Sequence, residues 1–327
     1  MSFLEVNNLN VEFNTADGIV RAVNNVSFSL EEGKILAIVG ESGSGKSQTV
    51  FAMMGLLDQN GRATGSVKFE DQEILNLSIS ELNLIRSEKI AMIFQDPMTA
   101  LNPVYTIGSQ IKENLLYHTS MDKKSIANKT IEMLEKMGIP LPHQRAEEYP
   151  HQFSGGMRQR AMIAMALSCN PKIVIADEPT TALDVTIQAQ VLDLLKKLQS
   201  ETGMSILFIT HDLGVASKMA DHIAVMKDGE IVETKSKKDL FRKPEHPYTL
   251  KLFSAIPSWE KRVNEGEIES THRRESTLLE VKNLKVHYPI KKGIFKRTIG
   301  QVRAVDDVRI KLHEGETVAL VGESATG

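Results

Sequence analysis

Residues 34–47 read KILAIVGESGSGKS, and this stretch determines what kind of fold the rest of the chain must form. Its first half is a continuous apolar run, typical of a strand buried on both faces of a parallel sheet. Its second half fits the pattern G-x-x-x-x-G-K-[S/T], and QTVFAMMGLL at 48–57 follows as a predicted helix. A strand, a glycine-rich loop and a helix in this order predict a phosphate-binding loop.

The residues of this loop suit the phosphates of a nucleotide, although the loop alone does not choose among kinases, GTPases and transport ATPases. Glycines let backbone N–H groups wrap phosphate oxygens without side-chain clashes, and the helix points its positive N-terminus at them. We expect Lys46 to reach the β- and γ-phosphates and the Ser47 hydroxyl to ligate Mg²⁺. The predicted nucleotide-binding residues of the loop are Gly40, Glu41, Ser42, Gly43, Ser44, Gly45, Lys46 and Ser47.

An acidic pair follows a second buried strand, KIVIAD at 172–177. Adjacent carboxylates at the end of a buried strand are costly unless a cation is near. Asp177 suits the Mg²⁺ shell, usually through water, and Glu178 can orient and deprotonate an attacking water. The alternative is an ordinary pair of loop carboxylates that ends a strand.

Short apolar runs alternate with longer amphipathic stretches along the chain, which predicts an α/β fold with a mainly parallel sheet. Two early strands, 4–13 and 22–30, look antiparallel and predict a β subdomain beside that sheet. The remaining predicted strands are 34–40, 90–94, 172–177, 205–210 and 222–226, and the predicted helices include 123–137, 154–168, 186–200 and 212–219.

The stretch FSGGMRQR at 153–160 narrows the choice among families of phosphate-loop proteins. Ser154 is a good helix N-cap, and Gly155 and Gly156 expose backbone N–H groups as a second anion site. The stretch resembles the signature motif of the ABC transporter ATPases, in which it completes the ATP site of the opposing domain. The resemblance implies a P-loop NTPase of ABC type with a helical subdomain at about residues 96–170. Phe153 and Met157 differ from the residues that are commonest in this motif, and both resemble the variants found in the peptide-importer branch of the family.

The same resemblance implies roles for four further residues. Phe13 would stack on adenine, although a strand core residue is the alternative. Gln95, in IFQDP, would join Mg²⁺ and the attacking water to the transporter interface. Asp184, in TTALD, would lie between the two ATP sites of a dimer. His211, in LFITHD, would contact the γ-phosphate. The implied catalytic set is Lys46, Gln95, Glu178 and His211, and the implied metal set is Ser47, Gln95 and Asp177.

The stretch KPEHPYTLKLFSAIP at 243–257 resembles a C-terminal segment of oligopeptide, dipeptide and nickel importer ATPases. An ordinary amphipathic helix after a proline turn is the alternative. The resemblance implies an ATP-hydrolysing subunit that powers an importer for peptides or related small solutes. It further implies two transmembrane permease subunits, a second ABC ATPase domain paired head to tail, and indirectly an extracytoplasmic solute-binding protein.

The sequence repeats itself after a charged stretch at 258–277, which we interpret as a linker. LEVKNLKVHY at 279–288 matches 4–13, and 303–327 matches 21–45 with about half the positions identical. We therefore expect a complete ATPase domain at 1–257. Residues 278–327 would be the N-terminal fragment of a second one that ends within its phosphate loop, as in the first part of a fused two-ATPase subunit. Ala325 replaces the counterpart of Gly43.

Composition excludes several classes of protein. The net charge of −3 gives no basic field for nucleic acid, so no nucleic-acid partner is expected. The single cysteine, Cys169, excludes an internal disulfide or a multi-cysteine metal site, and we interpret it as a small buried hydrophobe. No signal peptide or membrane-spanning window is visible, which predicts a cytosolic protein whose membrane association goes through a partner. The resemblance to importer ATPases implies a peripheral position on the cytoplasmic side of the inner membrane, through the permease subunits.

Two alternatives to a transport ATPase stay open. A soluble ABC ATPase of translation or DNA repair would need long helical insertions, zinc cysteines or a basic face, all of which the sequence lacks. The second alternative is a truncated remnant that binds nucleotide without productive turnover, because the second copy lacks its own lysine, signature, acidic pair and histidine.

Overall fold

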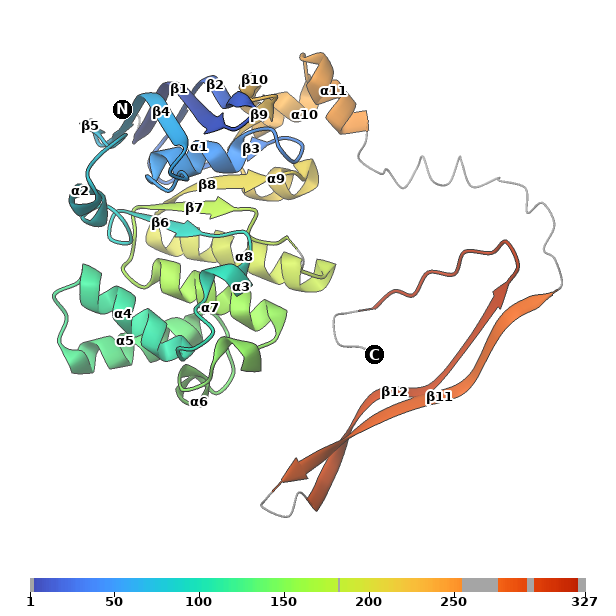
Figure 1. Ribbon diagram of the computed structural model, residues 1–327. Helices are drawn as coiled ribbons and strands as arrows, with labels where there is room; N and C mark the ends of the chain where they lie inside the picture. Colours follow the sequence, from blue (N-terminus) through green and yellow to red (C-terminus); the bar gives the residue numbers. More distant parts are fainter. Residues whose placement is uncertain (1–2, 182, 255–275, 293–296, 323–327) are drawn as a thin grey trace. The chain divides into compact units, whose positions relative to one another are not determined.

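The computed structural model describes residues 3–181, 183–254, 276–292 and 297–322 (Figure 1). The chain divides into two compact units. The first holds Met1–Leu183 and Ile187–Ile256, and the second holds Asp184–Thr186 and Pro257–Gly327. Most of the predicted linker, Ala325 and the end of the second phosphate loop lie outside the described residues.

A six-stranded sheet organises the first unit. Five strands are parallel, and the sixth is an antiparallel edge strand, which confirms the predicted α/β fold with a mainly parallel sheet. In spatial order the strands are β10 (Glu230–Ser236), β9 (His222–Lys227), β3 (Ile35–Val39), β8 (Ser205–Thr210), β7 (Ile173–Asp177) and β6 (Ile90–Ile93).

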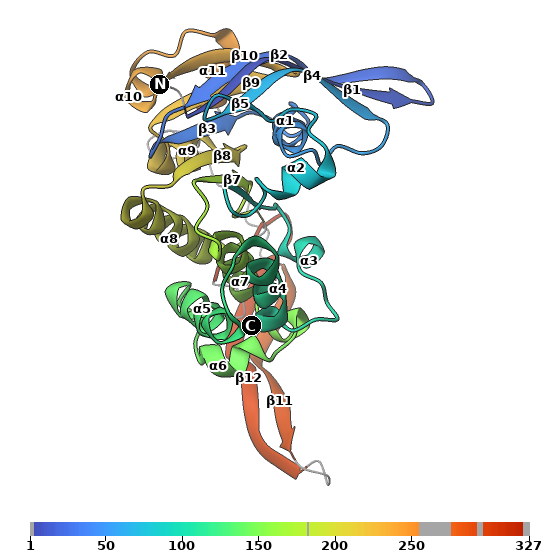
Figure 2. The same cartoon turned by 90° about the vertical axis from the view of Figure 1, so that its left-hand side faces the viewer.

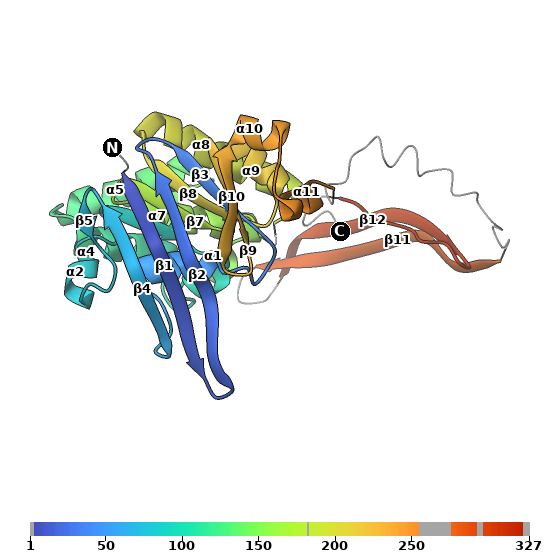
Figure 3. The same ribbon diagram turned by 90° about the horizontal axis from the view of Figure 1, so that it is seen from above.

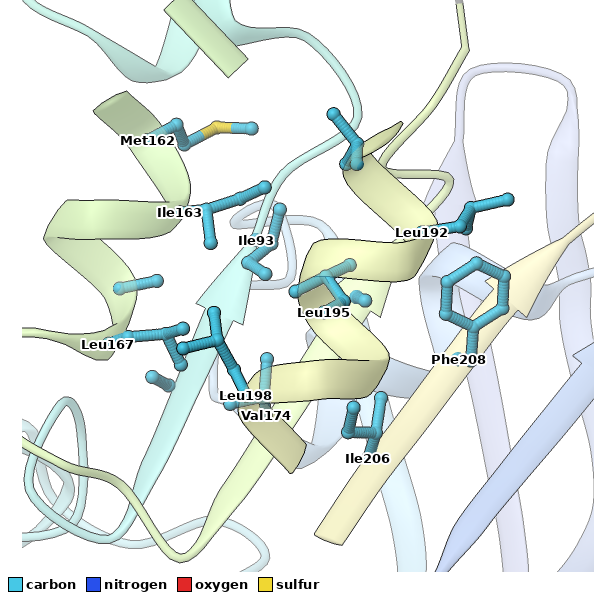
Figure 4. Packing of buried hydrophobic residues seen from close by; sticks show 14 of the residues in the cluster. Ile93, Met162, Ile163, Leu167, Val174, Leu192, Leu195, Leu198, Ile206 and Phe208 are labelled. Atoms are coloured by element: carbon cyan, nitrogen blue, oxygen red, sulfur yellow. The ribbon is translucent and has the colours of Figure 1, made fainter. Parts of the chain in front are cut away.

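The apolar runs in these strands are continuous because both faces of the sheet are covered. Along β3, Leu36 and Ile38 pack into one hydrophobic cluster, while Ala37 and Val39 pack into the other. Successive side chains of a strand point to opposite faces, so one short run serves two cores. Figure 4 shows one core, in which Phe208 and Val174 from the sheet face residues of two helices, α7 (Gly155–Leu167) and α8 (Val185–Thr202).

The predicted antiparallel subdomain forms a four-stranded sheet, whose three long strands lie side by side in Figure 3. Helix α1 (Lys46–Met53) buries Val50 and Met53 in the cluster between the two sheets. It ends before residue 57, earlier than predicted, because Gly55 adopts a left-handed conformation (φ 61°). The strands are β2 (Gly18–Leu30), β1 (Leu4–Thr15), β4 (Gly61–Phe69) and β5 (Gln72–Glu73).

Helices cover the other face of the parallel sheet (Figure 2). Five of them lie where the helical subdomain is predicted, and the four predicted helices from 123 to 219 are present within two residues at each end. The helices not yet given are α2 (Ile79–Asn83), α3 (Pro97–Ala100), α4 (Ile107–His118), α5 (Lys123–Lys136), α6 (Pro142–Ala146), α9 (Leu213–Met219), α10 (Lys237–Arg242) and α11 (Pro247–Ser254). A 3₁₀ turn at Pro150–Gln152 precedes α7.

The second unit is a long hairpin, β11 (Thr277–Lys292) and β12 (Arg297–His313), whose sequence repeats that of β1 and β2. Its backbone repeats their irregularity as well. Asn8 and Asn25 both have positive φ and share a side-chain hydrogen bond, and so do their counterparts Asn283 and Asp307. The domain boundaries at 257 and 278 stay a prediction.

Within the described residues, no helix combines the length and the apolar character that crossing a bilayer requires.

A buried carboxylate on β10 holds the backbone of the turn that precedes α11. Glu233 accepts hydrogen bonds from the backbone N–H groups of Glu245 (2.9 Å) and His246 (3.0 Å), and its side chain is 6% exposed. Lys235 Nζ lies 2.9 Å from the same carboxylate. Burial alone would raise the pKa of Glu233. The nearby Thr249 hydroxyl, Lys235 and the two N–H groups outweigh that effect and lower the pKa to about 2.

We predict that Glu233→Gln destabilises the protein at neutral pH by about 2 kcal/mol, because the ionised carboxylate is preferentially stabilised in the folded state. A lowered folded-state pKa contributes stability above the ordinary value of 4.5, and that stability is lost as the pH falls towards 2. Urea unfolding followed by circular dichroism should therefore show a gap in the free energy of unfolding between wild type and variant. This gap should be widest near pH 7 and should narrow below pH 4.5. Glu201→Gln, at a half-exposed carboxylate on α8, is the matched control and should show no such gap. A gap that does not change with pH would contradict the role given to the charge of Glu233.

Candidate functional site

Most of the predicted catalytic residues lie in loops that follow neighbouring parallel strands. Lys46 follows β3, Glu178 follows β7, and His211 follows β8, which lies between them. Gln95 follows β6 at the edge of the sheet. The carboxyl ends of parallel strands meet at one edge of a sheet, and this edge is where open α/β sheets bind ligands.

The phosphate loop closes around its own lysine. Lys46 Nζ donates to the carbonyl oxygens of Gly40 (2.9 Å) and Glu41 (2.8 Å), and Ser44 Oγ lies at 3.4 Å. The side chain is only 4% exposed. Burial lowers the pKa of Lys46, while the charges of Glu178 and Asp177 act in the opposite direction. The ammonium is thus held inside the loop whose backbone is predicted to bind phosphate.

Each glycine of the loop is required for a different physical reason. A Cβ on Gly40 would lie 2.2 Å from the Met226 carbonyl oxygen, so close packing excludes a side chain there. Gly45 combines a φ of 100° with a Cβ position 2.3 Å from the Ala22 carbonyl oxygen. Gly43 has a φ of 81° and no neighbouring atom within 4 Å of its Cβ position. Glu41, Ser42 and Gly43 are exposed at the tip of the loop, where a ligand can reach the backbone.

Ser47 and Asp177 form a pair beside the lysine. Ser47 Oγ donates to Asp177 Oδ1 at 3.0 Å, and Asp177 is 2% exposed. Burial raises the pKa of Asp177 to about 6 and the charge of Glu178 adds to the rise, against the Ser47 hydrogen bond and Lys46. A buried carboxylate this poorly compensated would be stabilised by a further cation.

The pair fits a magnesium ion. Hydroxyl and carboxylate oxygens are hard ligands, and Mg²⁺ takes one or two from the protein and completes its shell with phosphate and water. Among the described residues, no group of three or more His, Cys, Asp or Glu side chains could hold a metal ion by itself.

Glu178 is the point at which the predicted catalytic residues meet. Its Oε2 accepts from Gln95 Nε2 (3.2 Å) and lies 3.1 Å from His211 Nδ1, while Oε1 lies 4.0 Å from Lys46 Nζ. The backbone of Glu178 is left-handed (φ 43°), which costs about 1 kcal/mol or more in a residue other than glycine. Such strain is typical of functional positions. We call Lys46, Gln95, Glu178 and His211 the Glu178 cluster.

The structure adds Thr181, which sequence reasoning missed. Its hydroxyl donates to Glu178 Oε2 at 2.9 Å. A threonine three residues after a strand-terminal carboxylate is placed to turn back onto it, and this spacing was the available signal.

The residues of the signature stretch are not part of the Glu178 cluster. Ser154 caps α7, and its Oγ accepts from the Met157 N–H at 3.3 Å, as predicted. Gly156 packs against α8, with its Cβ position 2.8 Å from Ile187 Cγ2, whereas the Cβ position of Gly155 has no neighbour within 4 Å. No hydrogen bond joins Ser154, Gly155 or Gly156 to that cluster in the described part of the chain.

Three other predicted residues have these positions. Phe13 lies on β1, partly buried against the core between the sheets, so its predicted contact with adenine stays a prediction. Asp184 immediately precedes α8, and its role stays a prediction too. Cys169 is half-buried, and burial raises the pKa of its thiol, as expected of a packing residue rather than a reactive one.

Comparison with known families agrees with both parts of the predicted resemblance. The family described as "ABC transporter" matches residues 23–181, and the family described as "Oligopeptide/dipeptide transporter, C-terminal region" matches residues 232–281. Two solved cassettes have the same fold. A post-hydrolysis dimer of the ATP-binding cassette MJ0796, bound to ADP and Pi, is 30% identical with a TM-score of 0.64, and the match covers 72% of this chain and 98% of that one. The protein cbiO1 from Clostridium perfringens, part of the ABC transporter complex cbiONQ, is 26% identical with a TM-score of 0.63, over 78% of this chain and 96% of that one.

Curated relatives are more similar still. The oligopeptide transport ATP-binding protein OppD of Salmonella typhimurium is 54% identical over 254 residues, which are 78% of this chain and 76% of the relative. The glutathione import ATP-binding protein GsiA of Escherichia coli K12 is 43% identical in an alignment 350 positions long, which covers 99% of this chain and 56% of the relative. The chain thus spans about half the length of the GsiA proteins that it matches. The fold class and the family inferred from the signature stretch are confirmed: this chain belongs to the ABC transporter family of ATP-binding proteins.

Proposed function

We propose that this chain binds ATP with Mg²⁺ and hydrolyses it to ADP and phosphate, and that hydrolysis powers an ABC importer for peptides or related small solutes. The observation that carries the proposal is the convergence of Lys46, Gln95 and His211 on Glu178, beside the Ser47–Asp177 pair. These side chains supply a phosphate-binding cation, a base and a metal-binding pair at one sheet edge.

Each residue has a distinct part in this proposal. Lys46 and the loop N–H groups hold the β- and γ-phosphates, while His211 contacts the γ-phosphate. A water attacks the γ-phosphorus and loses its proton to the Glu178 carboxylate, and the bond between that phosphorus and the bridging oxygen of ADP breaks. Ser47 and Asp177, with Gln95, would hold Mg²⁺, which neutralises charge on the phosphates.

The signature residues Ser154, Gly155 and Gly156 would act on the ATP of an opposing ATPase domain. Two observations support this assignment. No hydrogen bond joins these residues to the Glu178 cluster in the described part of the chain, and the phosphate loop already supplies an anion site for one bound triphosphate. Asp184 would run between the two sites. The opposing domain is either a second copy of this chain or a related ATPase, and the dimeric state in which MJ0796 was solved is consistent with such pairing.

The importer itself is inferred from the relatives. OppD is named for oligopeptide transport and GsiA for glutathione import, so a peptide-like solute is the leading class. The partners would be two permease subunits that hold the chain at the cytoplasmic face of the inner membrane, and indirectly a solute-binding protein outside it. A non-catalytic remnant is the competing function, and activity decides between the two.

We predict that Asp177→Asn abolishes the help that Mg²⁺ gives to nucleotide binding, because it removes the carboxylate of the proposed metal pair. The affinity for a fluorescent ADP, measured with Mg²⁺ and then with a chelator, should differ clearly in wild type, and the ratio should fall towards one in the variant. Asp193→Asn, at an exposed aspartate of α8, is the matched control and should keep the wild-type ratio. An unchanged ratio in Asp177→Asn would remove Asp177 from the metal site.

We predict that Glu178→Gln binds ATP but hydrolyses it about a hundredfold or more slowly, because the amide cannot take the proton of water. A closed dimer of the variant should then accumulate when ATP binds. Light scattering after gel filtration, with and without MgATP, measures the size of the protein and so detects this dimer. Lys46→Ala should prevent both binding and dimerisation.

The outcomes of this experiment separate the remaining alternatives. A variant that keeps wild-type turnover would show that Glu178 is not the base. A variant that stays monomeric at saturating MgATP would show that a different ATPase domain supplies the opposing face. Wild-type protein that binds nucleotide without turnover would favour the remnant.

A further inference from the structure

The C-terminal segment of the first unit contacts the phosphate loop directly. Tyr248, at the start of α11, accepts a hydrogen bond through its hydroxyl from the Glu41 backbone N–H at 3.1 Å, across 207 positions of sequence. The tyrosine is 6% exposed. A phenol buried to this degree normally satisfies its hydroxyl, and here it does so on the loop predicted to bind nucleotide.

One residue of the loop connects this contact to the lysine. The N–H of Glu41 is held by Tyr248, and the carbonyl oxygen of Glu41 accepts from Lys46 Nζ at 2.8 Å. The two bonds fix the orientation of the peptide planes on either side of Glu41. A displacement of the Tyr248 hydroxyl would therefore rotate a carbonyl that orients the Lys46 ammonium.

Two further contacts surround the same part of the loop. Lys251 Nζ, one turn along α11 from Tyr248, lies 3.9 Å from the Glu41 carboxylate. Lys227 Nζ lies 5.5 Å from the centre of the Tyr248 ring, and the turn after Lys227 donates from Gly229 N–H to the Ser44 carbonyl oxygen at 3.0 Å. The loop is thus supported both by α11 and by the turn between β9 and β10.

The supporting segment is itself fixed. Glu233 on β10 holds the N–H groups of Glu245 and His246, and His246 Nδ1 accepts from the Tyr248 N–H at 3.2 Å. Tyr248 therefore begins a helix whose start is attached to the edge strand of the parallel sheet. A group positioned in advance lowers the ordering cost of ligand binding.

We infer that residues 245–251, which we call the HPY segment, position the phosphate loop for nucleotide, with Tyr248 as the positioning residue that acts through Glu41. The inference rests on the proposed function, since it assigns to the C-terminal region a part in the affinity of the same site. In the described part of the chain, the Tyr248 hydroxyl bonds to the loop backbone and to no side chain of the Glu178 cluster, so we expect its effect on binding and not on the chemical step.

The test is Tyr248→Phe in the full chain, which keeps the ring and removes the hydroxyl. The dissociation constant for fluorescent ADP with Mg²⁺ should rise about three- to tenfold, as the loss of one hydrogen bond predicts. The KM for ATP should rise by a similar factor while kcat stays within about twofold, because support of the loop is the same in the ground and transition states.

Two control variants separate positioning from general effects. Tyr117→Phe removes a hydroxyl from a tyrosine of α4 that is 80% exposed, and it should leave both constants unchanged. Ile126→Val, in the core of α5, lowers stability mildly without touching the phosphate loop, and it should lower the melting temperature without raising the dissociation constant.

The inference is overturned if Tyr248→Phe binds fluorescent ADP as wild type does, or if Ile126→Val weakens binding equally. A fall in kcat with an unchanged KM would also overturn it. Failure of the proposed function looks different. Either wild type itself does not bind fluorescent ADP, so that Lys46→Ala changes nothing, or wild type binds ADP without turnover, in which case Tyr248→Phe still raises the dissociation constant if the inference holds.

Discussion

Three buried charges at one edge of the parallel sheet constrain the rest of the structure. Lys46 is 4% exposed, Asp177 is 2% exposed and the Glu178 side chain is 11% exposed. None could be buried alone at a tolerable cost, so the strands that carry them must lie close enough for each charge to offset another. The order β3, β8, β7 achieves this, because the loops after these strands then share one edge. Burial raises the pKa of Asp177, and the charge of Glu178 adds to the rise. The three charges still sum to one negative charge in excess, so the edge suits a divalent cation.

Sequence alone predicted the parts of this site that depend on local pattern. Gly40 to Ser47, Asp177 and Glu178 each follow a short continuous apolar run, which is typical of a buried strand. Gln95 and His211 could be named only through family resemblance, because a lone glutamine or histidine after a short strand has no specific chemical signal of its own. Strand β4 was missed because Gly61 and Gly65 interrupt its pattern, and α1 was predicted too long because the apolar run continues past the glycine that ends it.

The repeated sequence shows the limit of local pattern most directly. Residues 35–39 and 317–321 read ILAIV and TVALV, yet only the first stretch is a strand. In the first unit β3 is hydrogen-bonded on both sides, to β8 and β9, and all five of its residues are buried. No strand pairs with residues 316–322 in the described part of the second unit, where Leu320 is 79% exposed. Whether an apolar run forms a buried parallel strand depends on the strands beside it, so two similar sequences form a strand in one place and not in the other. The contact between Tyr248 and Glu41 could not be predicted either, because the sequence around each residue gives no indication of its partner.

The arrangement around Glu178 suggests why nucleotide binding and hydrolysis would be coupled in one site. Glu178 Oε2 is shared by Thr181, Gln95 and His211, while Oε1 faces the Lys46 ammonium. Lone pairs of a carboxylate that are occupied by donors are not available to accept a hydrogen bond from an attacking water. Phosphate oxygens compete for two of the groups around Glu178, because Lys46 and His211 are the side chains proposed to bind the γ-phosphate. Binding of the substrate would thereby free lone pairs of Glu178 for that water, while Thr181 and Gln95 keep the carboxylate in place. Glu178 would thus accept a hydrogen bond from the attacking water only when the substrate is bound.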